Sequence, residues 1–272
     1  MKPRTVLITG AGSGFGRGAA LILAARGHDV IASVRNDAQR QDLETQAQAE
    51  GLSLRVPVLE LTSESDRDAA LGWNIDVLVN NAAIGAGGPI SEIPLQRVRE
   101  VFEVNVFATL ALTQPIAAQM VERGRGRIVF VSSIAGLTAG AYLGAYASSK
   151  HALEAIAESM ADELAPHGIQ VATLNPGPFA TGFNDAMIAS IDEWFSTEQN
   201  FTRPEDLASL KERFANQFPP DSLIEEMVGL VEADSGPYRT IDPAQSAELV
   251  RSRQERAWTR QQSPAVFGEG PA

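Results

Sequence analysis

Residues Thr9-Gly10-Ala11-Gly12-Ser13-Gly14-Phe15-Gly16 join a short apolar run, residues 5–9, to a stretch with helical periodicity, residues 14–26. Glycines in such a strand-to-helix connection allow a tight turn and a close approach of the backbone to a ligand. The free N–H groups at the start of the following helix favour a negatively charged group. The stretch therefore predicts a pyrophosphate-binding turn after the first strand of a doubly wound α/β sheet.

Apolar runs and longer helical stretches continue to alternate along the chain. The expected strands are residues 5–9, 30–34, 54–59, 76–80, 127–132 and 169–175, with 237–241 as a further edge strand. The expected helices between them include residues 14–26, 37–50, 95–123 and 145–166. Continuous apolar strands separated by helices are typical of a parallel sheet that helices cover on both faces. We therefore expect an α/β fold with a single doubly wound (Rossmann) parallel sheet over residues 1–272, a helical substrate-lid insertion at 183–235 and a flexible tail at 263–272.

Composition and charge exclude several classes of function. The chain has 272 residues, a formal net charge of −12 and no cysteine. The acidic balance argues against a nucleic-acid or anionic-membrane partner, and the lack of cysteine excludes disulfides and thiolate nucleophiles. No signal-peptide pattern and no run of about 18 apolar residues is present, so we expect a cytoplasmic protein. The three histidines lack ligand spacing, so no metal site is expected, and the arginines at 123, 125 and 127 alternate with glycines as in a solvated turn.

A tyrosine and a lysine, Tyr146 and Lys150, lie one helical turn apart in the helix after the expected fifth strand. Positions i and i+4 share a helix face, so both side chains can face one cleft. Ser133 precedes Tyr146 by 13 residues and follows that strand, at the sheet edge where such folds bind ligands. Only three of the 22 Lys and Arg residues are lysine, and one of them occupies this position. An ordinary exposed pair is the alternative, and the glycine turn and Ser133 argue against it.

The glycine spacing provides the first resemblance to a known family. Gly10, Gly14 and Gly16 form Gly-x-x-x-Gly-x-Gly, and with the serine, tyrosine and lysine this pattern resembles the short-chain dehydrogenase/reductase family. The resemblance implies an enzyme dependent on NAD(P) that acts on CH–OH groups and interconverts a secondary alcohol and a ketone or aldehyde by hydride transfer. The layout of residues 183–235 and 237–240 is similar to the steroid- and retinol-dehydrogenase-like branch of that family.

The same resemblance assigns roles to four catalytic residues. Tyr146 would be the acid/base, because a nearby ammonium and an oxidised nicotinamide both lower the pKa of a phenol. Lys150 would provide that ammonium and hold the cofactor ribose, and Ser133 would orient the substrate oxygen. Asn105 would be the fourth, linked to Lys150 through water in a proton relay; the alternative is an asparagine whose amide is satisfied within the core.

Further motifs at strand ends predict the cofactor contacts. Asn80-Asn81-Ala82-Ala83 resembles the family's Asn-Asn-Ala-Gly, and the segment 175–181 matches its Pro-Gly-x-x-x-Thr. Glu60 either contacts the adenine amine or is a solvated loop acid. The predicted cofactor-binding residues are Gly10, Ser13, Gly14, Phe15, Gly16, Arg35, Glu60, Asn80, Ala82, Lys150, Pro176, Gly177, Phe179 and Thr181.

The residues after the second strand indicate which cofactor is used. Val34 occupies the position where an acid would bind the ribose 2′-hydroxyl of NAD, and the guanidinium of Arg35 suits a 2′-phosphate. Against this, Ser13 stands where many phosphate-preferring relatives have a basic residue, and Asp37 is an acid nearby. We predict NADP, with NAD as the alternative.

The substrate is the part of the function that the sequence defines least. Apolar residues after Ser133 and in the insertion suggest an apolar or aromatic alcohol or carbonyl compound. Helix pairing across subunits in many relatives implies a homodimer or homotetramer. Two other functions stay open: a catalytically inactive cofactor-binding regulatory protein, which the intact catalytic set disfavours, and a lyase, epimerase or dehydratase, which the glycine spacing disfavours.

Overall fold

The computed structural model describes residues 2–262 and contains a six-stranded parallel sheet with the strand order β2-β1-β3-β4-β5-β6. The strands are β1 (Thr5–Ile8), β2 (Asp29–Ala32), β3 (Val77–Asn80), β4 (Gly126–Val131), β5 (Ile169–Pro176) and β6 (Arg239–Asp242). The helices are α1 (Gly14–Ala25), α2 (Asp37–Ala49), α3 (Glu64–Ala70), α4 (Leu95–Phe102), α5 (Thr109–Arg123), α6 (Gly144–Leu164), α7 (Phe183–Ala189), α8 (Pro204–Arg213), α9 (Asp221–Glu232) and α10 (Ala244–Thr259). The predicted doubly wound sheet is confirmed. The tail predicted at 263–272 lies outside the described residues.

The prediction of a regular strand at residues 54–59 was wrong, and Pro57 explains why. The segment runs parallel to β2 and its neighbours but forms only isolated bridges, at Arg55 and Val58. Arg55 exchanges backbone hydrogen bonds with β2 on both sides, and the Pro57 carbonyl accepts from the Val34 N–H. A parallel ladder would next require an N–H from residue 57, which proline lacks. The pairing with β2 is therefore interrupted at its centre.

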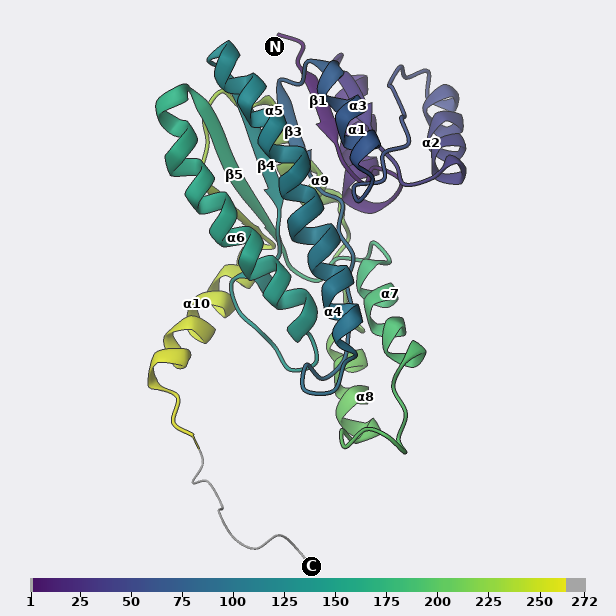
Figure 1. Cartoon of the computed structure of the whole chain (residues 1–272), viewed down its shortest axis with the longest axis vertical. Coiled ribbons are helices and arrows are strands. Elements are labelled where there is room, and N and C mark those ends of the chain that lie inside the picture. The colour runs from purple at the N-terminus through teal and green to yellow at the C-terminus, as the bar shows by residue number, and fades with distance from the viewer. Residues whose placement is uncertain (1, 263–272) are drawn as a thin grey trace, which may run out of the picture.

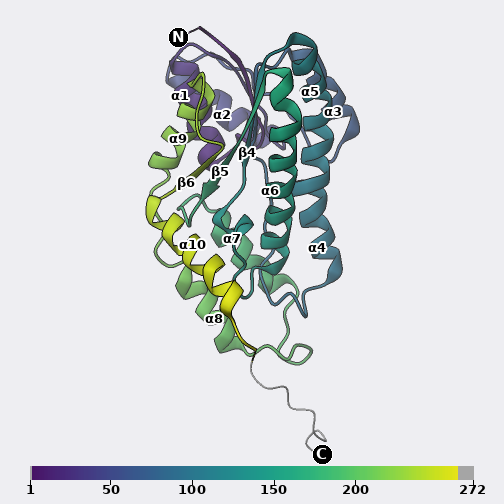
Figure 2. The same ribbon diagram turned by 90° about the vertical axis from the view of Figure 1, so that its left-hand side faces the viewer.

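Two helical layers cover the sheet, as Figures 1 and 2 show. On one face, α1 and α9 pack together and share a core with alternate residues of the strands; this core includes Val6 and Ile8 of β1 and Met227 of α9. On the other face, α5 and α6 enclose a second core around Leu7, Leu78 and Phe130. The strands thus bury side chains on both faces, which explains why they read as continuous apolar runs.

A single long helix, residues 95–123, runs along the second face (Figure 1). It consists of α4, a π-helical segment at Glu103–Ala108, and α5. By length and mean hydropathy it could cross a membrane, but half of its apolar window is buried within the protein. A core helix of a folded domain has these same properties.

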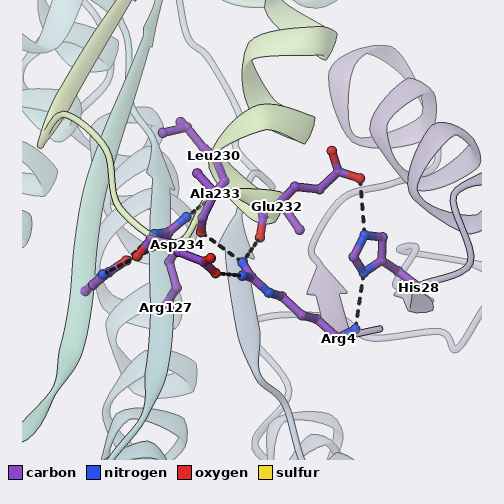
Figure 3. A network of polar contacts seen from close by, with 9 residues as sticks. Arg4, His28, Arg127, Leu230, Glu232, Ala233 and Asp234 are labelled. Carbon is purple, nitrogen blue, oxygen red and sulfur yellow. Dashed lines mark hydrogen bonds and ion pairs between the residues drawn. The ribbon is translucent and has the colours of Figure 1, made fainter. Parts of the chain in front are cut away.

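The predicted lid, residues 183–235, divides into two parts in the structure. α7 and α8 lie beyond the carboxyl ends of the strands (Figure 2), whereas α9 packs on α1 as part of the core. A network of hydrogen bonds and ion pairs connects the end of α9 to residues at the amino-terminal ends of the strands (Figure 3). There Arg4 binds Asp234 at 2.7 Å, and His28 accepts from the Arg4 backbone N–H at 3.2 Å and lies 3.3 Å from Glu232.

Arg127 belongs to this network, and the expectation of a solvated turn was wrong for it. Its side chain is buried, and its guanidinium donates to the Leu230 carbonyl and to Gln170. Burial lowers the pKa of Arg127, with the neighbouring Arg4 acting in the same direction. The glycine-rich turn before β4 gave no sign that α9, about a hundred residues later in the chain, would cover this residue.

Candidate functional site

A cavity of about 1370 Å³ opens at the carboxyl ends of the strands. The glycine-rich turn after β1 lines one part of it, and Ser133, Tyr146 and Lys150 line another. Parallel strands end at one edge of the sheet, so residues far apart in the sequence meet there. The structure therefore brings together the predicted pyrophosphate turn and three of the four predicted catalytic residues.

Tyr146 and Lys150 are both buried on one face of α6. The Lys150 ammonium donates to the Val131 carbonyl at the end of β4 at 2.8 Å and lies 5.8 Å from the centre of the Tyr146 ring. The ring of Phe183, the first residue of α7, packs at 5.3 Å from the Tyr146 ring. Ser133 Oγ accepts from the Ala135 N–H at 3.0 Å, which orients the hydroxyl. Each predicted catalytic side chain thus has a defined position before any ligand binds.

Burial shifts the pKa values of this pair in opposite directions. It raises the pKa of Tyr146 to about 12, with the Ser133 hydroxyl opposing the shift. It lowers the pKa of Lys150 to about 8, with the carboxylate of Glu154 opposing the shift. In both cases burial penalises the charged form, and the neighbouring group favours it. At neutral pH the phenol therefore retains its proton and the lysine remains largely charged.

Asn105 occupies the π-helical segment of the long helix and is 1% exposed. Its amide donates to the Ile84 carbonyl at 2.9 Å and to Ser149 Oγ at 3.0 Å, and its carbonyl accepts from the Ile84 N–H at 2.9 Å. Wider π turns are frequent at functional sites, because they redirect a side chain out of the regular helix. Asn105 thus fixes the loop after β3 to α6, without a direct hydrogen bond to Lys150.

The glycine-rich turn fits the pyrophosphate of a dinucleotide. Ser13 is the N-cap residue of α1, yet its side chain does not cap the helix, so the first N–H groups remain available to an anion. Gly10 has a φ of +67°, and a Cβ atom there would lie 2.8 Å from Ala82 Cα. A side chain at this position would push apart the two loops that line the cavity. This site could hold NAD or NADP, and a bound nicotinamide would supply or accept the hydride.

We expect Gly10→Ala to lower the free energy of unfolding by about 2–4 kcal/mol, from left-handed backbone strain plus overpacking against Ala82. Gly51→Ala is a matched control, because Gly51 has a φ of +69° and no other atom lies within 4 Å of the place that its new methyl group would occupy. It should show the backbone cost alone, about 1–2 kcal/mol. Urea denaturation of both variants measures the difference. Equal losses would contradict the close approach of Gly10 to Ala82.

Most of the predicted cofactor residues lie where the sequence placed them. The cavity is lined by Gly10, Ser13, Gly14, Phe15, Arg35, Glu60, Ala82, Lys150, Pro176, Gly177, Phe179 and Thr181. Gly16 is instead buried beneath the turn, where a Cβ atom would lie 2.6 Å from Asn81 Nδ2. Its place close to this amide is consistent with the tight helix–strand packing expected of the last glycine.

Asn80 does not line the cavity, and its neighbour Asn81 does. The Asn80 amide is buried and donates to Thr113 Oγ1 on α5 at 2.9 Å. Asn81 Nδ2 donates to the carbonyls of Thr9 and Gly10, at 2.8 and 3.1 Å. Asn81 therefore ties the loop after β3 to the glycine turn. Successive side chains at the end of a strand point to opposite faces, so one asparagine faces the core and the next faces the glycine turn. The two adjacent asparagines in the sequence were the feature that could have predicted this arrangement.

A buried polar cluster beneath Tyr146 and Lys150 was not predicted from the sequence. Glu154, one turn after Lys150 on α6, accepts from Asn175 Nδ2 at 2.5 Å and from the Arg239 guanidinium at 2.8 Å. The same Asn175 amide donates to the Ser133 carbonyl at 3.1 Å. Asn175, at the end of β5, thus links Glu154 to the Ser133 backbone, and the Glu154 carboxylate acts on Lys150 electrostatically. The Lys-x-x-x-Glu spacing in α6 was available in the sequence, but its partner on β6 was not predictable.

Comparisons with known proteins agree with this geometry. Residues 4–191 match the family model described as short chain dehydrogenase. Human retinol dehydrogenase 8 is 32% identical over 254 residues, which cover 87% of this chain and 80% of that protein. The structure of a short-chain dehydrogenase from Streptomyces avermitilis is similar with a TM-score of 0.80, 27% identity and coverage of 95% and 94% of the two chains. A Beutenbergia cavernae protein solved with bound NADP is similar at a TM-score of 0.70, 31% identity and coverage of 84% and 88%. The chain therefore belongs to the short-chain dehydrogenase family, whose members are oxidoreductases that act on CH–OH groups.

Proposed function

We propose that this protein interconverts a secondary alcohol and its ketone, or a primary alcohol and its aldehyde, with NADP(H), using Tyr146 as the acid/base. The observation that carries the proposal is the convergence of Ser133, Tyr146 and Lys150 on the cavity that the glycine turn also lines. A nicotinamide cofactor supplies the hydride for reduction and accepts it in oxidation. The chain's own residues then need only bind the substrate oxygen and transfer one proton to it or from it.

The chain divides that task among its three side chains. Ser133 offers a hydroxyl, held by the Ala135 N–H, that can donate to the substrate oxygen and orient it. In reduction, Tyr146 donates its phenolic proton to that oxygen as the oxygen gains electrons; in oxidation, the phenolate removes the hydroxyl proton. The Lys150 ammonium stabilises the phenolate electrostatically in the buried site. Phe183 covers the tyrosine ring and excludes water from one side of it.

The ribose side of the cavity supports NADP. Val34 and Arg35 both line it. Asp37, the nearby acid that favoured NAD in the sequence, does not line it. Asp37 instead pairs with Arg40 at 2.9 Å, on its own helix. The Arg35 backbone N–H donates to Gln39 Oε1 at 3.0 Å, which holds the strand end in place while leaving the guanidinium available. The Beutenbergia relative with bound NADP adds support from outside the chain.

Replacing Arg35 with alanine should raise the KM for NADPH about tenfold or more while changing the KM for NADH less than about twofold, because one charge-assisted contact to a 2′-phosphate is lost. Arg40→Ala is the matched control, since Arg40 is nearby but paired with Asp37. Steady-state kinetics with both cofactors measures the ratio. An equal effect on NADPH and NADH would remove the preference for NADP.

The substrate side of the cavity favours an extended, mainly apolar molecule. Ile134, Leu143, Phe183, Met187 and Phe214 line it. The name of retinol dehydrogenase 8 describes a long apolar alcohol as the substrate of that relative. Absorbance of NADPH, followed with a panel of aliphatic and aromatic ketones, tests the proposed reaction. If NADPH binds tightly and no ketone in the panel consumes it, the reaction assigned to this site is wrong.

We also propose that the protein is cytoplasmic and that it forms a homo-oligomer, the latter as the family resemblance implies. The long helix supports the assembly, because Leu95 and Phe107 are 60% and 57% exposed on it. Both side chains would be removed from water if this helix pairs across subunits. Light scattering of the purified protein checks the mass, and a monomer would contradict the proposal.

A further inference from the structure

Two arginines from separate helices meet at the rim of the substrate side of the cavity. Arg213 is the last residue of α8, and Arg253 lies in α10; both line the cavity. Figure 2 shows α8 and α10 at the end of the molecule where the strands terminate. The sequence separation of the two residues is large, so only the fold brings them together.

The Arg213 guanidinium is held in place. It donates to the Ala141 carbonyl at 2.9 Å, in the loop that leads from Ser133 to Tyr146. α10 is attached to the same loop, because Gln254 donates to the Leu137 carbonyl at 3.2 Å. The Arg213 side chain and the helix that carries Arg253 are therefore both attached to the loop between Ser133 and Tyr146.

The two guanidinium groups repel each other. Partial burial lowers the pKa of Arg213, and the charge of Arg253 lowers it further, whereas Tyr142 acts in the opposite direction. Within residues 2–262, no carboxylate forms a salt bridge with either of them. In a chain of net charge −12, acidic partners are abundant, and other arginines such as Arg203 and Arg239 have them. Like charges held together in this way are typical of a site that binds an anion.

The distribution of acids along the cavity agrees with this interpretation. Its acidic lining residues, Glu60, Glu100 and Glu103, come from the segment between α2 and α3 and from the long helix. The segments that carry Tyr146, Phe183, Arg213 and Arg253 contribute none to the lining. The substrate side therefore has a positive rim over a mainly apolar interior.

We propose that Arg213 and Arg253 bind an anionic group of the substrate, a carboxylate or phosphate, at the end remote from the reacting carbonyl. Arginine suits this role because its planar guanidinium forms two parallel hydrogen bonds with such groups. The apolar side chains between the rim and Tyr146 would accommodate the connecting hydrocarbon. This inference rests on the proposed function, since it specifies which carbonyl compounds that site accepts.

Paired substrates that differ only in charge test the proposal. The probes are 4-oxopentanoate, 7-oxooctanoate and 10-oxoundecanoate, each with its methyl ester, assayed with NADPH. For at least one chain length, the acid should have a KM about tenfold lower than its ester, as expected for a charge-assisted contact. The advantage should shrink as salt increases, because the rim is partly exposed. No preference for the acid at any length would overturn the proposal.

Arginine variants locate the effect. Arg213→Ala and Arg253→Ala should each raise the KM of the preferred acid about tenfold and leave that of its ester within about twofold. Arg256→Ala is the matched control, because Arg256 lies one turn further along α10 and does not line the cavity. Equal losses for acid and ester, or the same loss in Arg256→Ala, would contradict a subsite for the anion.

A binding measurement separates this proposal from the proposed reaction. Calorimetric titration of the three keto acids into the NADPH-loaded protein does not require turnover. Binding that is lost in the Arg213→Ala/Arg253→Ala double variant supports the anion subsite even if no probe is reduced, in which case only the reaction has failed. Keto acids that do not bind, or that bind the double variant equally well, would overturn the subsite, whatever the esters do as substrates.

Discussion

Replacing Tyr146 with phenylalanine should reduce kcat for ketone reduction by about a thousandfold, within the range that general acid–base groups contribute. The substitution removes one oxygen and preserves the ring that packs at 5.3 Å against Phe183. The residue is only 8% exposed and its ring is held by packing, so the substitution should leave the surrounding structure intact. Cofactor binding should persist, because the glycine turn is unchanged. Stopped-flow and steady-state kinetics measure the rate, and NADPH fluorescence titration measures the binding.

Tyr238→Phe is the matched control for this experiment. Burial raises the pKa of the Tyr238 hydroxyl to about 12, as it does for Tyr146. The Tyr238 hydroxyl is buried away from the cavity, and it has no hydrogen-bond partner within the described residues. Its removal should leave kcat within about twofold. Activity retained in Tyr146→Phe, or lost equally in both variants, would show that Tyr146 is not the proton donor.

The pKa of Tyr146 also determines the sign of the pH dependence. A pKa of about 12 without cofactor means that the phenol is protonated throughout the neutral range. Reduction uses that protonated form and should be insensitive to its titration between pH 6 and 8 or so. Oxidation uses the phenolate, so its rate should rise with pH, at a midpoint lowered by the ammonium and the oxidised cofactor. A rate of oxidation that falls as pH rises would contradict this assignment.

The sequence predicted that Ser133, Tyr146 and Lys150 would face one cavity because the geometry of this set is local. Tyr146 and Lys150 need only one regular helix to share a face, and Ser133 needs only a strand that ends before it. The pyrophosphate turn is local for the same reason. Such features depend on the backbone conformation of a few consecutive residues, and the residue types reveal that conformation.

The features that the sequence did not predict depend on contacts across the chain. Arg127 was assigned to a solvated turn because its burial depends on α9, which is distant in the sequence. Residues 54–59 were predicted to be a strand because they are mostly apolar, and the effect of the N–H that Pro57 lacks was not taken into account. Arg213 and Arg253 acquire a common role only when α8 and α10 reach the same loop. Side-chain type alone cannot distinguish such residues from ordinary surface arginines.

The buried carboxylate of Glu154 leads to the second large effect. Glu154→Gln keeps an amide oxygen that can accept from Asn175, but it removes the charge that pairs with Arg239 at 2.8 Å. Loss of one member of a buried ion pair costs about 3–5 kcal/mol. The Arg239 side chain is 34% exposed, which reduces the cost, so we expect the free energy of unfolding to fall by about 2–3 kcal/mol. Glu158→Gln, one turn later on the exposed side of α6, changes the charge equally and should cost less than about 0.5 kcal/mol.

The pH profile shows whether Glu154 acts beyond stability. Its carboxylate raises the pKa of Lys150, which burial has lowered to about 8. Without that charge the pKa of Lys150 must fall further, so a larger fraction of the lysine is neutral at a given pH above 7. If the charged lysine stabilises the phenolate, the alkaline limit of kcat/KM moves to lower pH in Glu154→Gln and stays in place in Glu158→Gln. Destabilisation with an unchanged alkaline limit would restrict Glu154 to a structural role. A shifted limit would make Glu154 a positioning residue that acts through Lys150. A change in packing alone would not shift the titration of Lys150 while its hydrogen bond to the Val131 carbonyl is kept.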